Sequence, residues 1–150
     1  MEQAANIDET NLEGLQLHIR LLVVDDHKRA RRDIRSVLST HHDIEVVGEA
    51  DTGEEAVKRV RELHPDVVLL DISLPGISGI EAANTMRETA PESRVIFVSQ
   101  YDSPLIAKDA LLTGACGYVV KSDAAKDLWP AIEAAFRGHT FLSRTVRPAR

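Results

Sequence analysis

The stretch Asp66–Gly76 constrains the fold of this chain more than any other. Its four consecutive apolar residues, Val67–Leu70, run directly into Asp71, and turn residues follow soon afterwards. A short apolar run bounded by turn residues is typical of a strand buried on both faces of a parallel sheet. Asp71 then lies at the carboxyl end of that strand, where open parallel sheets place their ligand crevice. Taken alone, this carboxylate could be a nucleophile, a metal ligand or the cap of the loop and helix that follow.

From Ile19 onward, strand and helix patterns alternate strictly. Each short apolar run is followed by apolar residues at helical spacing. Such alternation with short connections predicts an α/β fold with five parallel strands and helices on both faces, a doubly wound (βα)5 arrangement. The predicted strands are Leu21–Val24, Ile44–Val47, Asp66–Leu70, Arg94–Ser99 and Gly117–Val120.

Local signals mark the helix boundaries. The patterns Thr52-x-x-Glu55 and Ser78-x-x-Glu81 predict capping boxes at the second and third helices. Pro104 suits the first turn of the fourth helix, and Asp123 is expected to cap the fifth. Pro130 lies inside the fifth helix, where it is expected to kink or break it.

One domain, residues 19–138, accounts for most of the 150 residues. Residues 1–18 are polar and acidic and predict a flexible N-terminal extension. Residues 139–150 predict a C-terminal linker or tail. The net charge is −6, but four acids and no Lys or Arg fall within the first 19 residues, so the remainder carries only −2. A nearly neutral body offers no electrostatic footprint for nucleic acid.

The sequence favours a cytoplasmic location. Cys116 is the lone cysteine, which excludes an internal disulfide and suits a reducing compartment. The chain has no apolar run near 18 residues and no secretory signal pattern, so we expect no membrane association.

Side chains able to do chemistry follow several of the predicted strands. Because the carboxyl ends of parallel strands meet at one edge, we expect these segments to converge. Three acids in one crevice repel each other unless a cation intervenes, and Mg²⁺ is the expected cofactor. A hydroxyl and an ammonium opposite the metal suit phosphoryl transfer to an aspartate nucleophile. The residues are Asp25, Asp26, Asp71, Ser99 and Lys121, with the Ser73 carbonyl as a further metal ligand.

Each of these residues also has an ordinary structural interpretation. Asp26 could cap the next helix, Ser99 could bond to the backbone, and Lys121 could be a surface charge. Their joint placement on one edge favours the functional interpretation. The histidines, including His27, show no metal-ligand spacing and are not expected to bind the ion.

With these residues in place, the chain resembles the receiver domain of two-component response regulators. The resemblance covers residues 19 to about 138 and implies the flavodoxin-like receiver fold. It is carried by Val23-Val24-Asp25-Asp26, Leu70–Gly79, Ser99 and Gly117–Lys121. It also implies that Asp71 accepts a phosphoryl group from a sensor histidine kinase, that Asp25 and Asp26 bind Mg²⁺, and that Lys121 contacts the phosphoryl group.

The resemblance further implies a conformational switch. Ser99 would be the switch hydroxyl and Tyr118 the switch aromatic, which rotates inward when phosphorylation draws Ser99 towards Asp71. Ser73, Gln100 and Tyr101 would flank the hydrolytic water and tune the lifetime of the acyl phosphate. Gln100 stands where many receivers have a smaller residue, so we expect it to slow phosphorylation by small donors.

The amino-acid sequences of these motifs are most similar to those of the NarL/FixJ (LuxR-type) subfamily. That likeness implies transcriptional output through a DNA-binding domain absent from this chain, and a possible homodimer through the fourth helix, fifth strand and fifth helix. A stand-alone receiver and a non-phosphorylated interaction module are the alternatives. The basic first helix, with Lys28, Arg29, Arg31, Arg32 and Arg35, is either a solvated face or a kinase-docking surface.

Two enzyme classes fit the sequence poorly. A haloacid-dehalogenase type of phosphohydrolase requires a second aspartate two residues after the nucleophile, where this chain has Ser73. A dinucleotide-binding oxidoreductase requires a glycine-rich loop after the first strand, where this chain has Asp25-Asp26-His27-Lys28. We therefore expect a phosphoacceptor that catalyses its own phosphorylation and dephosphorylation, not a turnover enzyme.

Overall fold

The structure is a computed structural model that describes residues 18–146. The N-terminal extension predicted for residues 1–18 therefore falls, except for its last residue, outside the described residues, as does the end of the predicted tail. In chain order the elements are β1 (Ile19–Val24), α1 (Lys28–Leu38), β2 (Ile44–Ala50), α2 (Gly53–Leu63), β3 (Val67–Leu70), α3 (Gly79–Thr89), β4 (Arg94–Ser99), α4 (Pro104–Leu111), β5 (Gly117–Val120), α5 (Ala124–Phe136) and β6 (Phe141–Leu142).

All neighbouring strands of the sheet pair in parallel, in the order β2-β1-β3-β4-β5-β6. The five predicted strands are confirmed, and β6 adds a sixth at the edge beside β5. The chain winds outward from β1 in one direction to β2 and in the other to β3, so the strand order reverses at β1. In a doubly wound sheet, this reversal opens a crevice at the carboxyl ends of the central strands.

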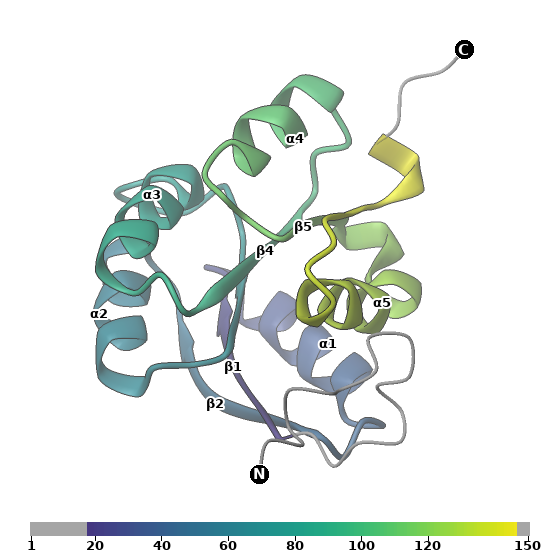
Figure 1. The fold of residues 1–150 in the computed structure, drawn as a ribbon, viewed down its shortest axis with the longest axis horizontal. Coiled ribbons are helices and arrows are strands. Elements are labelled where there is room, and N and C mark those ends of the chain that lie inside the picture. Colours follow the sequence, from purple (N-terminus) through teal and green to yellow (C-terminus); the bar gives the residue numbers. More distant parts are fainter. Residues whose placement is uncertain (1–17, 147–150) are drawn as a thin grey trace, which may run out of the picture.

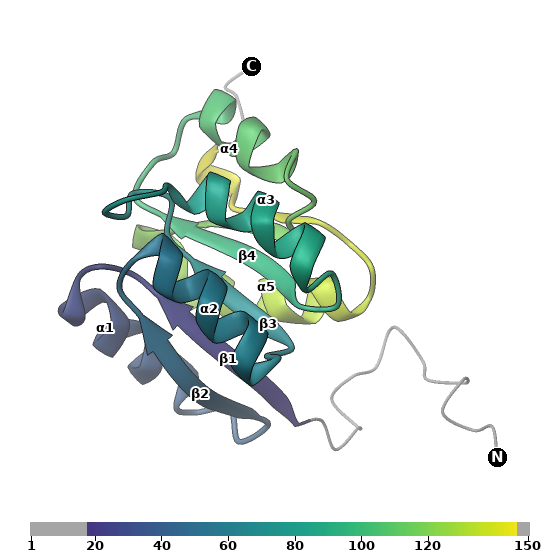
Figure 2. The ribbon, with the colours of Figure 1, turned by 90° about the vertical axis from the view of Figure 1, so that its left-hand side faces the viewer.

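The helices divide into two layers, one on each face of the sheet, as Figures 1 and 2 show. On one face, α2, α3 and α4 pack over a core that includes Leu22, Leu70 and Phe97. On the other, α1 and α5 pack over a core that includes Leu21 and Ile132. Alternate residues of each strand thus enter different cores, which is why the central strands are apolar throughout rather than alternating.

The helix starts follow the local sequence signals. Ser78 and Glu81 form both hydrogen bonds of a capping box at α3, as predicted. At α2 the Thr52 hydroxyl accepts from the backbone N–H of Glu55, but the Glu55 carboxylate accepts from Arg59 instead of completing the box. Pro104 occupies the first turn of α4, after the capping residue Ser103.

The prediction of a linker after residue 138 is wrong for Phe141–Val146. Phe141 and Leu142 pair with Gly117 and Tyr118 of β5, and a short 3-10 turn follows at Arg144–Val146. The hydroxyl of the buried Ser143 accepts from the Val120 N–H at 3.1 Å and donates to Asp127 Oδ2 at 2.6 Å. The segment is therefore an integral part of the sheet edge.

Two expectations about α5 differ from the structure. Pro130 does not break the helix, which continues from Ala124 to Phe136. Asp123 precedes the helix, but within the described chain its side chain makes no capping hydrogen bond. A 3-10 turn, Lys121–Asp123, leads into α5, and the Asp123 carboxylate accepts from the Thr145 hydroxyl at 2.7 Å.

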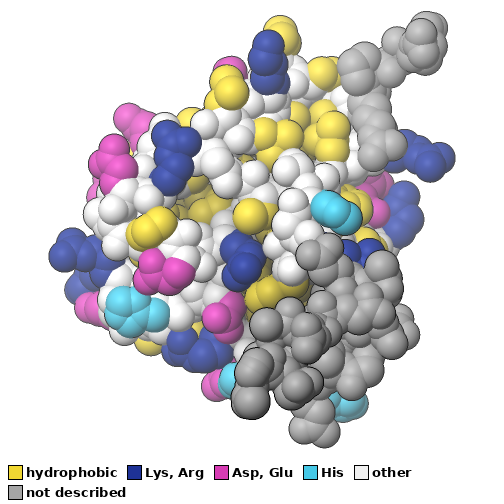
Figure 3. Space-filling view, in the orientation of Figure 1, with side chains coloured by type: hydrophobic (Ala, Val, Ile, Leu, Met, Phe, Trp, Pro, Cys, Tyr) yellow, Lys and Arg dark blue, Asp and Glu magenta, His cyan; other side chains and the backbone are white. Residues whose placement is uncertain are grey.

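Apolar side chains gather on the surface over α4 and the chain beside it (Figure 3). Leu105 and Leu112 are exposed, and a groove between α4 and the C-terminal segment is lined by Ala107, Leu111 and Val146, among others. None of the helices in residues 18–146 has the length and apolar character needed to cross a membrane.

Candidate phosphorylation site

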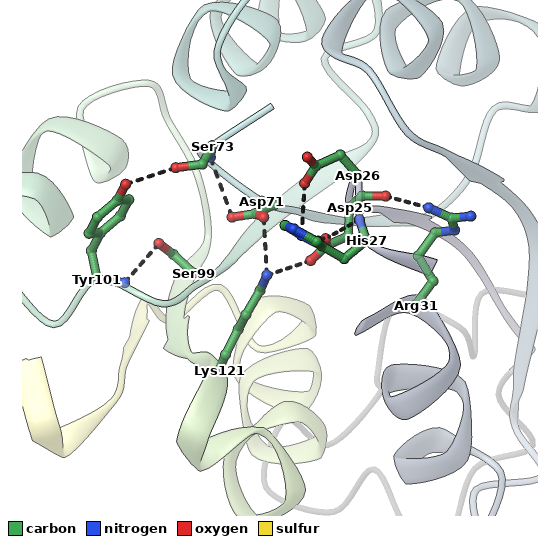
Figure 4. Close-up of polar contacts among 9 residues, drawn as sticks. All are labelled: Asp25, Asp26, His27, Arg31, Asp71, Ser73, Ser99, Tyr101 and Lys121. Atoms are coloured by element: carbon green, nitrogen blue, oxygen red, sulfur yellow. Dashed lines mark hydrogen bonds and ion pairs between the residues drawn. The ribbon is translucent and has the colours of Figure 1, made fainter. Parts of the chain in front are cut away.

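The carboxyl ends of four strands bring together the side chains that the sequence singled out (Figure 4). Asp25 follows β1, Asp71 follows β3, Ser99 ends β4 and Lys121 follows β5. The structure therefore confirms that these four strand ends bring the expected side chains to one edge of the sheet.

Lys121 stands between two of the acids. Its Nζ lies 2.6 Å from Asp25 Oδ2 and 3.1 Å from Asp71 Oδ2. The side chains of Asp25 and Asp71 are only 1% and 4% exposed, whereas that of Lys121 is 27% exposed. One partly accessible ammonium thus offsets two carboxylates that are almost sealed from bulk solvent.

This arrangement perturbs the protonation of the charged groups. Burial raises the pKa of Asp71 above its ordinary value, the Lys121 charge opposes the increase, and the neighbouring Asp25 adds to it. Burial would lower the pKa of Lys121, but its contacts with Asp25 and Asp71 raise it above the ordinary value. Lys121 is therefore held charged, while the site tolerates a full charge on Asp71 less well than water does.

Asp25 and Asp26 provide the oxygens that could hold a divalent cation. One ligand atom from each of these residues and from His27 lie within 4.8 Å of one another. His27 Nδ1 is 3.0 Å from Asp26 Oδ1, but among residues 18–146 this buried oxygen has no partner with hydrogen-bond geometry. An unsatisfied carboxylate oxygen beside a second buried acid fits a hard, oxygen-seeking ion such as Mg²⁺. His27, 72% exposed, reaches this group although no spacing in the sequence indicated it.

The loop after β3 places Asp71 through two glycines. A Cβ on Gly79 would lie 2.0 Å from the Asp71 carbonyl oxygen, and the Gly79 N–H donates to the Ile72 carbonyl at 2.8 Å. Gly76 has φ of 77°, a conformation that other residues rarely adopt, and Glu54 lies against it. The close turn therefore depends on glycine at both positions.

Ser73 and Tyr101 meet across the entrance to the site. The Ser73 hydroxyl is 3.0 Å from the Tyr101 hydroxyl, and the Ser73 N–H points to Asp71 Oδ1 at 3.4 Å. The buried Ser99 hydroxyl accepts from the Tyr101 N–H at 3.1 Å. Gln100, between them in sequence, is exposed. Of the three predicted tuning residues, two thus line the entrance together.

Tyr118 occupies the inward position. It is fully buried in the core beneath α2, α3 and α4, and its hydroxyl donates to the Tyr101 carbonyl at 2.7 Å. Burial raises the pKa of its phenol, which therefore stays a hydrogen-bond donor. The inward arrangement that we expected to follow phosphorylation is already present in the described chain.

Arg31 lies near the site although the sequence indicates only a basic surface on the first helix. It is 16% exposed, and it contacts Glu49 and the Asp25 backbone. A signal was available: Arg31 shares the spacing i, i+3, i+7 with the buried Ile34 and Leu38, so it lies on the inner face of α1.

The comparisons with known proteins agree with this geometry. The response regulator receiver domain family matches residues 21–133. The chain therefore belongs to this family of two-component signalling proteins. Its relatives and structural neighbours identify it as a receiver of the NarL/FixJ type, as the motifs indicated.

Among relatives, the response regulator GacA of Pseudomonas viridiflava is 39% identical over 128 residues, which are 85% of this chain and 60% of GacA. The chain thus spans less than two thirds of the length of such relatives. A two-component response regulator of the LuxR family from Aurantimonas sp. SI85-9A1 superposes with a TM-score of 0.82 and 34% identity, covering 86% of this chain and 92% of that one. The RcsB response regulator of Salmonella typhimurium, in a structure concerned with DNA interaction, superposes with a TM-score of 0.80 and 26% sequence identity. The match covers 86% of this chain and 65% of the RcsB chain.

Proposed function

We propose that the chain is a phosphorylation-activated switch in which Asp71 accepts a phosphoryl group from a sensor histidine kinase. The observation that carries the proposal is the Lys121 ammonium placed between the buried carboxylates of Asp25 and Asp71. A nearly buried acid beside a cation and two further acids suits the positioning and charge neutralisation that phosphoryl transfer requires.

The transfer forms a bond between an Asp71 carboxylate oxygen and phosphorus. It breaks the bond from phosphorus to the imidazole nitrogen of the kinase histidine, or to the acetate oxygen of acetyl phosphate. Lys121 pairs with a phosphoryl oxygen once Asp71 is modified, and the Ser99 hydroxyl is a second donor. Water later attacks phosphorus, which releases inorganic phosphate and restores the Asp71 carboxylate.

The metal ligands in this proposal are the carboxylates of Asp25, Asp26 and Asp71 and the Ser73 carbonyl. A bound Mg²⁺ would neutralise charge on the phosphoryl oxygens. Asp26 Oδ1, buried and without a hydrogen-bond partner among the described residues, supports this assignment. Ser73, Gln100 and Tyr101 set the lifetime of the acyl phosphate through the space they leave for the hydrolytic water.

Phosphorylation is proposed to stabilise the arrangement in which Tyr118 is buried and bonded to the β4–α4 loop. The surface that responds in this proposal is formed by α4, β5 and α5, and the exposed Leu105 and Leu112 lie in and just after α4. It is the proposed face for a homodimer or an effector. Output through a LuxR-type DNA-binding domain is proposed from the likeness to LuxR-family regulators; DNA would be contacted only through that domain.

Acetyl phosphate with Mg²⁺, followed by intact-mass measurement, tests the proposal. Wild type gains the mass of one phosphoryl group, and Asp71→Asn gains none. Asp127→Asn, which changes another buried aspartate away from the crevice, keeps the modification. Unmodified wild type in the presence of Mg²⁺ and donor would overturn the proposal and favour an interaction module that does not use phosphate.

A further inference from the structure

Arg31 links the second strand to the loop that carries two of the acids. Its Nε donates to Glu49 Oε1 at 2.7 Å, and its Nη1 donates to the Asp25 carbonyl oxygen at 2.7 Å. Figure 4 shows the guanidinium beside Asp25, on the side away from Lys121. One planar group therefore joins α1, β2 and the end of β1.

A β-bulge puts Glu49 within reach of this arginine. The pairing of β1 with β2 shifts between Leu21 and Leu22, because Val47 is an extra residue in β2. As a result Glu49 lies opposite Val23, whose side chain faces α1 and α5. Without the bulge Glu49 would lie opposite Val24 and face the other layer, since a shift of one residue reverses the face.

Three hydrogen bonds restrain Asp25, two at its backbone and one at its carboxylate. Its N–H donates to the Ala50 carbonyl at 3.1 Å, its carbonyl accepts from Arg31, and its Oδ1 accepts from the His27 N–H at 2.9 Å. Both backbone partners depend on β2, because Ala50 is its last residue and Arg31 is bonded to its Glu49. The direction in which Asp25 presents its carboxylate is thus fixed by the strand behind it as well as by its own strand.

The Glu49 carboxylate is suited to hold Arg31 at neutral pH. Partial burial would raise the pKa of Glu49, but the hydrogen bonds and charges of Arg35 and Arg31 lower it below its ordinary value. Arg35 also donates to Glu49, through its Nε, but it is 46% exposed. Arg31 and Arg35 therefore share Glu49 as a partner, and Arg31 in addition donates to the Asp25 carbonyl.

We propose that Arg31 is a positioning residue for the divalent-cation site, holding the Asp25 carbonyl so that the Asp25 and Asp26 carboxylates converge on the ion. The inference rests on the proposed function for the identity of the ion. This role distinguishes Arg31 from Arg35, whose hydrogen bond is to Glu49. Outer groups that orient metal ligands commonly change metal affinity by ten-fold or more when removed.

Direct Mg²⁺ titration by calorimetry, with no phosphodonor, tests this role in the 150-residue chain. Arg31→Met is expected to raise the Mg²⁺ dissociation constant by about ten-fold. Arg31→Lys keeps the charge but replaces the planar guanidinium, which bonds Glu49 and Asp25 through different nitrogens, with a single nitrogen. We therefore expect the Mg²⁺ dissociation constant to rise by about three-fold. Arg35→Met is the matched control: it removes an arginine from the same glutamate, leaves the Asp25 bond intact, and should change the constant by less than about two-fold.

Thermal unfolding of each variant separates positioning from general stability. Both Arg31→Met and Arg35→Met lose an ion pair with Glu49, so a structural role alone predicts parallel losses of stability and of Mg²⁺ affinity. Positioning predicts that affinity falls only when Arg31 is changed. If Arg31→Met does not fold, Glu49→Gln, which loosens Arg31 without removing it, is expected to weaken Mg²⁺ binding in the same direction.

Unchanged Mg²⁺ affinity in Arg31→Met and Arg31→Lys would overturn the inference, as would an equal loss in Arg35→Met. The proposed function fails by a different result, namely wild type that binds Mg²⁺ and is not modified by acetyl phosphate. In that case a selective loss of Mg²⁺ affinity in the Arg31 variants would still support the positioning role.

Discussion

Two buried aspartates in this chain have opposite surroundings. Asp71, which follows β3, and Asp127, which lies in α5, have residue exposures of only 3% and 7%. Asp71 faces the ammonium of Lys121 and the carboxylate of Asp25. Asp127 accepts from the neutral hydroxyl of Ser143, which is itself fixed by the Val120 N–H.

The difference is between a carboxylate that pairs with a partly exposed cation and one whose hydrogen bond joins α5 to the C-terminal segment. Asp71 has charged neighbours, lies at the carboxyl edge of the sheet and meets a partly accessible cation, so a ligand can change its partners. Asp127 is bonded inside the junction of α5 with the C-terminal segment. Burial alone therefore does not distinguish the two acids, and it is the charged partners of Asp71 that support its proposed role.

The largest expected effect comes from removing the cation beside Asp71. Lys121→Met leaves Asp25 and Asp71 buried without their shared counter-charge, which should lower the free energy of unfolding by about 3 kcal/mol at pH 7.5. Without Lys121 the pKa of Asp71 rises further. An acid with a raised folded-state pKa binds protons more tightly when folded, so the loss should shrink as the pH falls towards its unfolded-state pKa, about 3.9. Denaturant unfolding between pH 7.5 and pH 4.5 measures this.

Lys58→Met on the exposed face of α2 is the matched control, and we expect it to stay within about 0.5 kcal/mol of wild type at each pH. Millimolar Mg²⁺ should restore more stability to Lys121→Met than to wild type, because the ion replaces the lost charge among the acids. A pH-independent loss would contradict the view that Lys121 acts by neutralising Asp71 and Asp25.

The Asp127 side of the comparison predicts a smaller effect. Ser143→Ala removes one hydroxyl that serves two buried partners, Val120 N–H and Asp127 Oδ2. We expect a loss of about 2 kcal/mol in the free energy of unfolding, since both groups stay buried without that bond. Phosphorylation of Asp71 should be unchanged, because the hydroxyl does not reach the crevice.

Ser39→Ala provides the control for that loss. The Ser39 hydroxyl bonds to the Ser36 carbonyl at an exposed helix end. Its removal should cost well under 1 kcal/mol. Equal stabilities of Ser143→Ala and Ser39→Ala would mean that the segment Phe141–Val146 adds little to the fold, in agreement with its sequence-based assignment as a linker.

The same contrast explains which features were predictable from sequence. Asp25, Asp71 and Lys121 each follow an apolar strand, and parallel pairing alone brings such positions to one edge. The six-residue segment from Phe141 has no comparable signal, because a two-residue strand shows no periodicity. Its contacts with Asp127 depend on tertiary packing.

The position of Glu49 was also beyond sequence reasoning. The bulge at Val47 that turns Glu49 towards Arg31 is a register shift between β1 and β2, and the sequence of β2 alone does not specify it. Arg31 itself could have been found from its spacing with Ile34. Asp123 carried a normal capping signal, yet Thr145 from the unpredicted segment bonds to its carboxylate.

The smallest predicted effect concerns access to Asp71. Gln100 is exposed, and it lies in sequence between the buried Ser99 and Tyr101, whose hydroxyl is 3.0 Å from that of Ser73. Gln100→Ala should be phosphorylated by acetyl phosphate faster than wild type, by up to about five-fold, or roughly 1 kcal/mol in the barrier. Asn84→Ala on the exposed face of α3 removes a similar amide away from the crevice and should react at the wild-type rate. Equal rates for Gln100→Ala and wild type would mean that the Gln100 amide does not restrict approach to the Asp71 carboxylate.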